Sequence, residues 1–140
     1  RPYNIPKHRH LAEVEQELGE AAGHPVVISF TPHLVPISSG IATTIYATAA
    51  EGATVADVGR ALETAYGNEP FVRLLGEGVL PDTKHVVGTN YIDIGWVYDP
   101  RTHRFILCSA EDNLGKGAAS QAIQNFNLIH DLPETTGLER

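Results

Sequence analysis

The sequence predicts an α+β fold in which helices accompany a largely antiparallel sheet. Its 140 residues suit a single domain, and a composition of 42% hydrophobic and 19% charged residues is typical of a globular protein. The expected strands and helices do not alternate strictly, as they would in a parallel βαβ fold. A turn sequence at residues 99–102, Asp-Pro-Arg-Thr, joins two expected strands as an antiparallel hairpin.

The first expected helix begins at His10 and ends between Gly19 and Gly23. One helical face carries the apolar residues Leu11, Val14 and Leu18. Residues 1–9 contain two prolines and four basic side chains, which favours an irregular, extended segment before this helix.

Two strands are expected next. Residues 26–30 form a β-branched apolar run after Pro25, and residues 41–49 alternate around Thr and Tyr. Such alternation predicts a strand with one buried face. Pro32 and Pro36 interrupt the chain between the two strands.

A second helix is expected after Thr54, because Thr54 and Asp57 have the spacing of a helix N-cap and its third position. Gly67 stands where a glycine commonly ends a helix. Further strands are expected at residues 71–75, 85–87, 91–98 and 104–109, and a last helix at residues 117–129.

Composition excludes several classes of function. A net charge of −7 argues against a nucleic-acid-binding surface, and no run approaches the ~20 apolar residues of a membrane span. A single cysteine rules out an internal disulfide and a multi-cysteine zinc site. We therefore expect a cytoplasmic protein without nucleic-acid or membrane partners. Because the chain lacks methionine and begins with Arg1, we expect it to be a piece of a longer polypeptide.

The first candidate site is the run Lys7-His8-Arg9-His10, with Glu13 one helical turn after His10. A carboxylate within reach of an imidazole fixes its tautomer and orientation, as general acid/base catalysis requires. The cations Lys7 and Arg9 would favour an anionic substrate. Two alternatives stay open: a solvated basic segment before an acidic helix, or a metal site formed by His8, His10 and Glu13, whose spacing is not a standard one.

Three other features have both a functional and a structural interpretation. His33, in a loop bounded by prolines, could contact a ligand or make a structural hydrogen bond. Ser38-Ser39-Gly40 could hold an anion through backbone N–H groups, or it could simply form a turn. Cys108 lies in an apolar strand pattern, so it is expected to be a small core residue and a poor nucleophile.

Residues 114–120, Leu-Gly-Lys-Gly-Ala-Ala-Ser, partly match the dinucleotide-binding fingerprint. The match is weak, because its last position is Ser120 and no second strand follows the helix. Two glycines at a helix start nevertheless expose backbone N–H groups and let a ligand approach, and Asp112 and Asn113 add polar side chains there. The alternatives are a ligand site and a plain helix start loosened by glycine.

Taken together, these segments resemble the N-acetyl-γ-glutamyl-phosphate reductase family, NADPH-dependent enzymes of arginine biosynthesis. Five motifs occur in order: His8-Arg9-His10 with Glu13; residues 29–36, Ser-Phe-Thr-Pro-His-Leu-Val-Pro; residues 88–91, Gly-Thr-Asn-Tyr, with Asp93; residues 112–119 with their continuation at 121–125; and residues 134–138, Glu-Thr-Thr-Gly-Leu. Each motif alone would be a weak signal, but five in order are specific.

The resemblance implies a fold like the second domain of glyceraldehyde-3-phosphate and aspartate-semialdehyde dehydrogenases, a mixed sheet with helices on one face. It also implies reduction of an acyl phosphate to an aldehyde through a thioester on a catalytic cysteine. The expected roles are acid/base catalysis by His10 with Glu13, substrate binding by His8, Arg9 and His33, and contact with the nicotinamide half of NADP(H) by Asn113, Gly115, Lys116 and Gly117.

The chain departs from the family pattern in three respects. The motif that holds the nucleophilic cysteine and the Rossmann part that binds most of the NADPH have no match here, and Ser39 stands where the family commonly has arginine. We therefore expect residues 1–112 to be a partial catalytic and oligomerisation domain. Residues 113–140 would form a helix and tail that return to the missing nucleotide-binding domain. The alternative is a non-catalytic interaction or oligomerisation domain of the same fold.

Self-association is the last expectation. An antiparallel sheet usually leaves one face free, and aromatic residues commonly anchor interfaces. We therefore expect a homodimer or homotetramer formed through the sheet, with Tyr46, Tyr91 and Trp96 as candidates for its exposed face.

Overall fold

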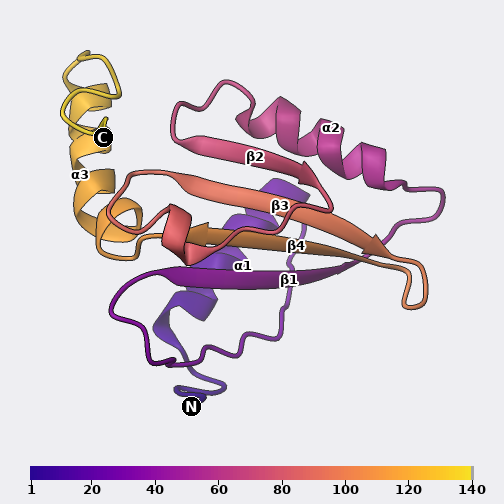
Figure 1. Cartoon of the computed structure of the whole chain (residues 1–140). Helices are drawn as coiled ribbons and strands as arrows, with labels where there is room; N and C mark the ends of the chain where they lie inside the picture. The colour runs from indigo at the N-terminus through magenta and orange to yellow at the C-terminus, as the bar shows by residue number, and fades with distance from the viewer. Residues whose placement is uncertain (140) are drawn as a thin grey trace. The chain divides into compact units, whose positions relative to one another are not determined.

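A computed structural model describes residues 1–139 and divides the chain into two compact units, Arg1–Ile37 and a larger one that begins at Ser38 (Figure 1). The division after Ile37 is independent of the expected division after residue 112, which stays a prediction.

The smaller unit contains one helix, α1, at Arg9–Ala22 (Figure 1). His8 is its N-cap, and Gly23 ends it in the left-handed conformation at φ +71°. The predicted helix is therefore confirmed. The strand predicted at residues 26–30 is wrong, because this run pairs with no strand among residues 1–139. Its Ile28 N–H instead donates to the Glu15 side chain at 3.1 Å.

The larger unit is built on a four-stranded sheet of β1 (Ile41–Thr48), β2 (Val72–Glu77), β3 (Ile92–Asp99) and β4 (Arg104–Glu111). The strand order is β1-β4-β3-β2 (Figure 1). β4 pairs antiparallel with both β1 and β3, whereas β2 pairs parallel with β3. The predicted α+β fold with a mixed, largely antiparallel sheet is confirmed.

The hairpin between β3 and β4 closes where the turn sequence predicted it. Asp99 pairs with Arg104, and the Asp99 carboxylate accepts the Arg101 backbone N–H at 2.9 Å. The strand predicted at residues 85–87 is wrong. Thr83–His85 is a 3₁₀ turn capped by Asp82, and the fully buried side chain of Val86 anchors the turn that follows.

The second helix, α2 (Val55–Tyr66), lies along one face of the sheet (Figure 1). The Thr54–Asp57 capping box is present as expected, and Gly67 ends the helix, although with a right-handed φ of −62°. Gly59 lets α2 approach the sheet, because a Cβ there would lie 3.2 Å from the Trp96 ring.

Of the three aromatic residues expected on the free face of the sheet, Tyr46 is exposed (64%) and Tyr91 is half-buried beside Phe71. Trp96 is only 7% exposed, so its assignment to the free face is wrong. In strand β3 it points to the side that α2 covers, where Gly59 leaves room for its ring.

The last helix, α3 (Ser120–Ile129), follows a π-helical turn at Gly115–Ala119. The predicted helix is confirmed, with this turn as an additional feature of its start. The helix buries polar residues, Gln124 and Asn127, whereas Ile123 and Phe126 are about half exposed. Its apolar side therefore faces away from the unit to which it belongs.

Candidate functional site

The histidine cluster lies at the start of α1. The Nδ1 atom of His8 accepts the His10 backbone N–H at 3.2 Å, which makes His8 the cap of the helix. The His8 ring also packs against the rings of Tyr3, His10 and Phe30, at centroid distances of 4.9–5.3 Å. Because Nδ1 accepts a hydrogen bond, the proton of the neutral His8 ring is on Nε2. His8 thus has a structural task, and its role in substrate binding stays a prediction.

His10 and Glu13 are both exposed. The Nε2 atom of His10 accepts a hydrogen bond from the neighbouring Arg9 Nε at 3.3 Å. Within residues 1–37, no hydrogen bond joins Glu13 to His10. The structure therefore places the expected acid/base beside Arg9 on the first turn of α1, and its orientation by Glu13 remains a prediction.

His33 lies in the proline-bounded segment of the same unit. Its Nδ1 atom is 3.1 Å from the Thr31 carbonyl oxygen, and its backbone forms an isolated antiparallel bridge with Pro2. The structural hydrogen bond considered for this residue is present. The exposed side chain is available for a ligand contact, which no observation tests.

A second cluster lies in the larger unit, at the turn that leaves β4. The buried carboxylate of Asp112 accepts the N–H of Gly88 at 2.7 Å and of Leu114 at 2.9 Å. The bond from Gly88 is the main cause that holds the pKa of Asp112 below its usual value; burial opposes this shift, and further backbone bonds from Leu114 and Gly115 support it. Asn113 accepts the Gly40 N–H at 2.7 Å through its Oδ1.

Two glycines allow the segments around this turn to meet. Gly40 has φ +106°, and a Cβ there would lie 3.1 Å from the Cβ of Thr83. A Cβ on Gly115 would lie 2.9 Å from the Thr89 carbonyl oxygen. Residues 38–40, 83–89 and 112–117 are therefore held together at one end of the sheet, which the sequence did not predict.

Lys116 is engaged within its own unit. Its Nζ donates to Gln124 Oε1 at 2.7 Å, and Asn90 donates to the same oxygen at 3.0 Å. Desolvation lowers the pKa of Lys116, and the nearby carboxylate of Glu111 opposes that shift. Gln124 in turn donates to Glu134, so this network fixes the tail against α3. The ammonium group serves the network, and cofactor contact by Lys116 stays a prediction.

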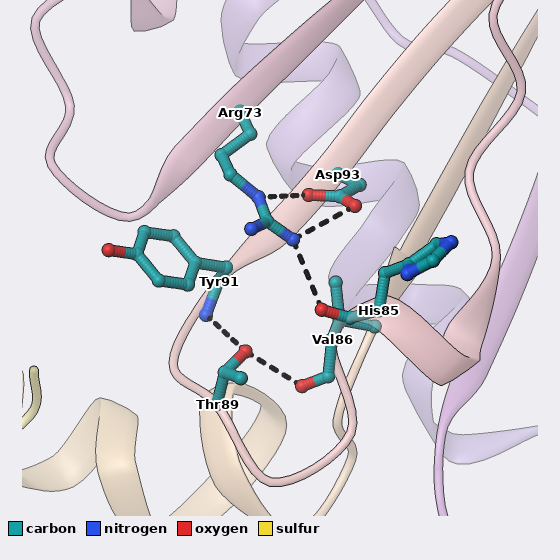
Figure 2. Close-up of polar contacts among 6 residues, drawn as sticks. All are labelled: Arg73, His85, Val86, Thr89, Tyr91 and Asp93. Atoms are coloured by element: carbon teal, nitrogen blue, oxygen red, sulfur yellow. Dashed lines mark hydrogen bonds and ion pairs between the residues drawn. The ribbon is translucent and has the colours of Figure 1, made fainter. Parts of the chain in front are cut away.

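Sequence reasoning did not assign a role to Arg73, which forms the most buried ion pair of the larger unit (Figure 2). Its guanidinium makes two bonds to Asp93, of 2.6 and 3.0 Å, and donates to the His85 carbonyl at 3.2 Å. It also lies 4.6 Å from the Tyr91 ring centroid. The signal was present in the sequence, since Asp93 stands between two apolar residues of an expected strand, and a carboxylate that becomes buried there is commonly paired with a cation.

Cys108 lies within β4, as its strand pattern predicted, but it is half-buried and not one of the core residues expected from that pattern. Among residues 1–139, no three or more His, Cys, Asp or Glu side chains are arranged to hold a metal ion. No helix in the part of the chain that the structure describes is both long and apolar enough to cross a bilayer.

Comparison with known proteins decides the family. Residues 1–113 match the family described as "Semialdehyde dehydrogenase, dimerisation domain". The chain belongs to this family. Among solved structures, this chain is similar to aspartate semialdehyde dehydrogenase II from Vibrio cholerae, with a TM-score of 0.68 and 20% identity. The match covers 94% of this chain and 39% of that one. It is also similar to aspartate semialdehyde dehydrogenase from Francisella tularensis, with a TM-score of 0.67 and 18% identity. That match covers 93% of this chain and 38% of the other.

Relatives identified by sequence share a higher identity with this chain than these two structures do. The chain is 59% identical to N-acetyl-gamma-glutamyl-phosphate reductase of Akkermansia muciniphila, over 97% of its own length and 39% of that protein. It is 55% identical to the enzyme of the same name from Geobacter sp. strain M21, over 94% of its length and 38% of that protein. The resemblance predicted from the five motifs is confirmed. The chain spans about two fifths of these relatives.

Proposed function

We propose that the chain is part of an NADPH-dependent reductase that converts N-acetylglutamyl 5-phosphate to the semialdehyde and releases phosphate. The observation that carries this proposal is 59% identity, over 97% of the chain, to a reductase of that name. The proposal concerns the complete protein, because the chain spans 39% of that relative. Its site of action is the cytoplasm, as suits an enzyme of amino-acid biosynthesis.

In the proposed reaction, the substrate acyl group forms a thioester with a cysteine outside residues 1–140. Cys108 does not suit this role, because it is half-buried in the middle of a sheet strand. His10 is proposed as the acid/base that moves a proton to or from the reacting group, with Glu13 orienting it. His8, Arg9 and His33 are proposed on the substrate side, where the exposed cation of Arg9 would favour an anionic substrate.

The nicotinamide cofactor supplies hydride when it is bound. The turn of residues 112–117 suits contact with it, because Asn113 is half-buried with its oxygen engaged and Gly117 is exposed without a side chain. We propose Asn113, Gly115, Lys116 and Gly117 as the residues nearest to the nicotinamide half. Most of the cofactor would be bound outside residues 1–140.

We further propose that the complete protein is a homodimer or homotetramer. The family description names a dimerisation domain. Strand β1 lies at the edge of the sheet, with its residues Ile45 and Tyr46 more than half exposed. The same observations would also suit a non-catalytic oligomerisation domain, so a test of activity has to separate the two functions.

The test measures NADPH oxidation with N-acetylglutamyl phosphate for the complete protein, for the isolated chain and for the Cys108→Ser variant of each. We expect turnover by the complete protein, unchanged turnover by Cys108→Ser and none by the isolated chain. An inactive complete protein would favour the non-catalytic alternative. Turnover by the isolated chain that disappears with Cys108→Ser would instead make Cys108 the nucleophile.

A further inference from the structure

The segment of residues 83–89, between β2 and β3 in the chain, lies against the candidate turn of residues 112–117. The Gly88 N–H donates to the buried Asp112 carboxylate at 2.7 Å. At a second point, Gly115 approaches the segment so closely that a Cβ would lie 2.9 Å from one of its carbonyl oxygens. The place of the turn therefore depends on where this segment lies.

Arg73 holds the beginning of the same segment (Figure 2). Its Nε and Nη2 atoms donate to the Asp93 carboxylate at 2.6 and 3.0 Å, and Nη2 also donates to the His85 carbonyl oxygen at 3.2 Å. Arg73 belongs to β2 and Asp93 to β3, so the guanidinium ties the segment to two paired strands. Because the contact uses the backbone of His85, it fixes the path of the chain.

Between these two points the chain is tightly held. The Val86 side chain is fully buried, and its carbonyl oxygen accepts the Thr89 hydroxyl at 2.7 Å. The Thr89 hydroxyl oxygen in turn accepts the Tyr91 N–H at 3.1 Å (Figure 2). A displacement at His85 would therefore be passed on to Gly88, since no loose stretch of chain lies between them to absorb it.

We propose that Arg73 is a positioning residue: by holding the His85 carbonyl, it fixes the segment 83–89 and thereby the turn of residues 112–117. This inference rests on the proposed function, in which that turn lies nearest to the nicotinamide half of NADP(H). The role requires no contact between Arg73 and the ligand. It affects only the half of the cofactor that meets the turn, because the rest of the cofactor would be bound outside residues 1–140.

The substitution Arg73→Lys removes the His85 contact and keeps the charge. The cation remains beside Asp93, so no buried carboxylate is left uncompensated and the variant should fold. The lysine Nζ stands where arginine has its guanidinium carbon, one bond short of the nitrogen that reaches His85, and it lacks the planar fork.

In the complete protein, we expect Arg73→Lys to raise the dissociation constant for NADP⁺ about tenfold, the loss typical of one hydrogen bond. The dissociation constant for 2′-phospho-ADP-ribose, which is NADP⁺ without its nicotinamide ring, should be unchanged. Calorimetry measures both constants and the number of binding sites.

The pair of ligands separates positioning from a merely structural role. A structural role would lower the number of folded molecules, and hence of binding sites, with both dissociation constants as in the parent protein. That result would overturn the proposal. An equal loss of affinity for the two ligands would also overturn it, because the effect would not be confined to the nicotinamide half.

Arg101→Lys is the matched control. Arg101 also makes two bonds to one aspartate, Asp99, at 3.3 and 3.2 Å, but in the hairpin where β3 and β4 join. This variant should bind both ligands as the parent protein does. A loss of NADP⁺ affinity as large as that of Arg73→Lys would contradict the positioning role.

Hydrogen exchange tests the contact between the segment and the turn without a ligand. The Gly88 and Leu114 amides both donate to Asp112, so we expect them to exchange about tenfold faster in Arg73→Lys and at the parent rate in Arg101→Lys. Parent-like exchange of both amides in Arg73→Lys would overturn the proposal. Faster exchange in a complete protein that binds no NADP⁺ would support the positioning and refute the proposed function, so the two failures are distinguishable.

Discussion

At the scale of single residues, the carboxylate of Asp93 shows how this chain accommodates a buried charge. The Asp93 side chain is 4% exposed and the Arg73 side chain 41%, so the pair lies between a surface salt bridge and a buried one (Figure 2). Arg73 also donates to the His85 carbonyl and lies over Tyr91, so it connects β2, β3 and the turn between them. The pair therefore both neutralises a charge and holds this turn against the sheet.

Removing only the cation should be costly. Arg73→Met leaves the Asp93 carboxylate buried without a partner, so we expect it to lower the free energy of unfolding by about 2–4 kcal/mol, between the values for exposed and buried pairs. Adding Asp93→Asn should restore part of this loss, because the uncompensated charge disappears. Urea denaturation of the two variants measures both effects. Equal stability of the single and double variants would show that the charge is not the cause.

His10 supports a prediction about catalysis in the complete protein. If it is the acid/base, His10→Asn should lower kcat at least tenfold, since such groups contribute about 10²–10⁴-fold in rate. Because His10 is exposed on the first turn of α1, the variant should fold normally. His24→Asn is a matched control, since His24 is also exposed in the same unit and its Nδ1 atom lies 3.1 Å from the carbonyl oxygen of the adjacent Pro25. A normal kcat in His10→Asn would transfer the role to His8 or end the hypothesis.

At the scale of elements, local signals predicted structure well where the element makes its own contacts. The Thr54–Asp57 box, the Asp99–Arg101 turn and the glycine after α1 all act within a few residues, and the structure contains each of them. The run at 26–30 has equally strong β propensity, but a strand also needs a partner strand. Propensity alone cannot show that, among the described residues, no strand pairs with this run.

The candidate site was predictable in part for the same reason. The motif at residues 112–117 identified the turn, and the resemblance identified its family. The contacts from Gly40 and Gly88, which lie 73 and 24 residues away in sequence, were not predictable, because nothing local specifies a long-range hydrogen bond. Burial of Trp96 depends likewise on Gly59 in a different element.

Helix α3 provides a prediction at this scale. It buries Gln124 and Asn127, and the Asn127 amide donates to the carbonyls of Glu134 and Thr136 at 3.0 Å each. Its apolar side is left uncovered by the described residues, with Ile123 46% and Phe126 53% exposed. At about 25 cal/mol per Å², leaving a few hundred Å² uncovered forgoes several kcal/mol, comparable with the net stability of a domain.

We therefore expect the α3 amides to be poorly protected, or protected only by self-association, in the isolated chain. They should be well protected in the complete protein, where the nucleotide-binding domain would cover the apolar side. Hydrogen exchange of residues 120–128 in both proteins is the measurement. Equal protection in a monomeric isolated chain would show that α3 belongs to the core of this domain, and the proposed division at residue 112 would be wrong.

At the scale of the whole molecule, the sheet presents an apolar edge strand without charges. Strand β1 has the sequence Ile-Ala-Thr-Thr-Ile-Tyr-Ala-Thr and lies at the edge of the sheet. Proteins usually protect such an edge with charges, proline or a covering element, and the β1 sequence contains neither charges nor proline. Together with the family description as a dimerisation domain, this supports a contact between copies of the complete protein.

Sedimentation of the complete protein at micromolar concentration should therefore show a dimer or a larger oligomer. Tyr46 is the best single residue with which to test the surface, because it is 64% exposed and aromatic residues commonly anchor interfaces. If β1 forms the contact, Tyr46→Glu would bury a charge there, so we expect it to shift the equilibrium toward monomer by tenfold or more. Arg104→Glu, which changes an exposed charge at the hairpin end of β4, is the comparison and should leave the oligomer intact. A monomeric parent protein would exclude self-association, whereas an oligomer that tolerates Tyr46→Glu would place the interface on a surface away from this side of β1.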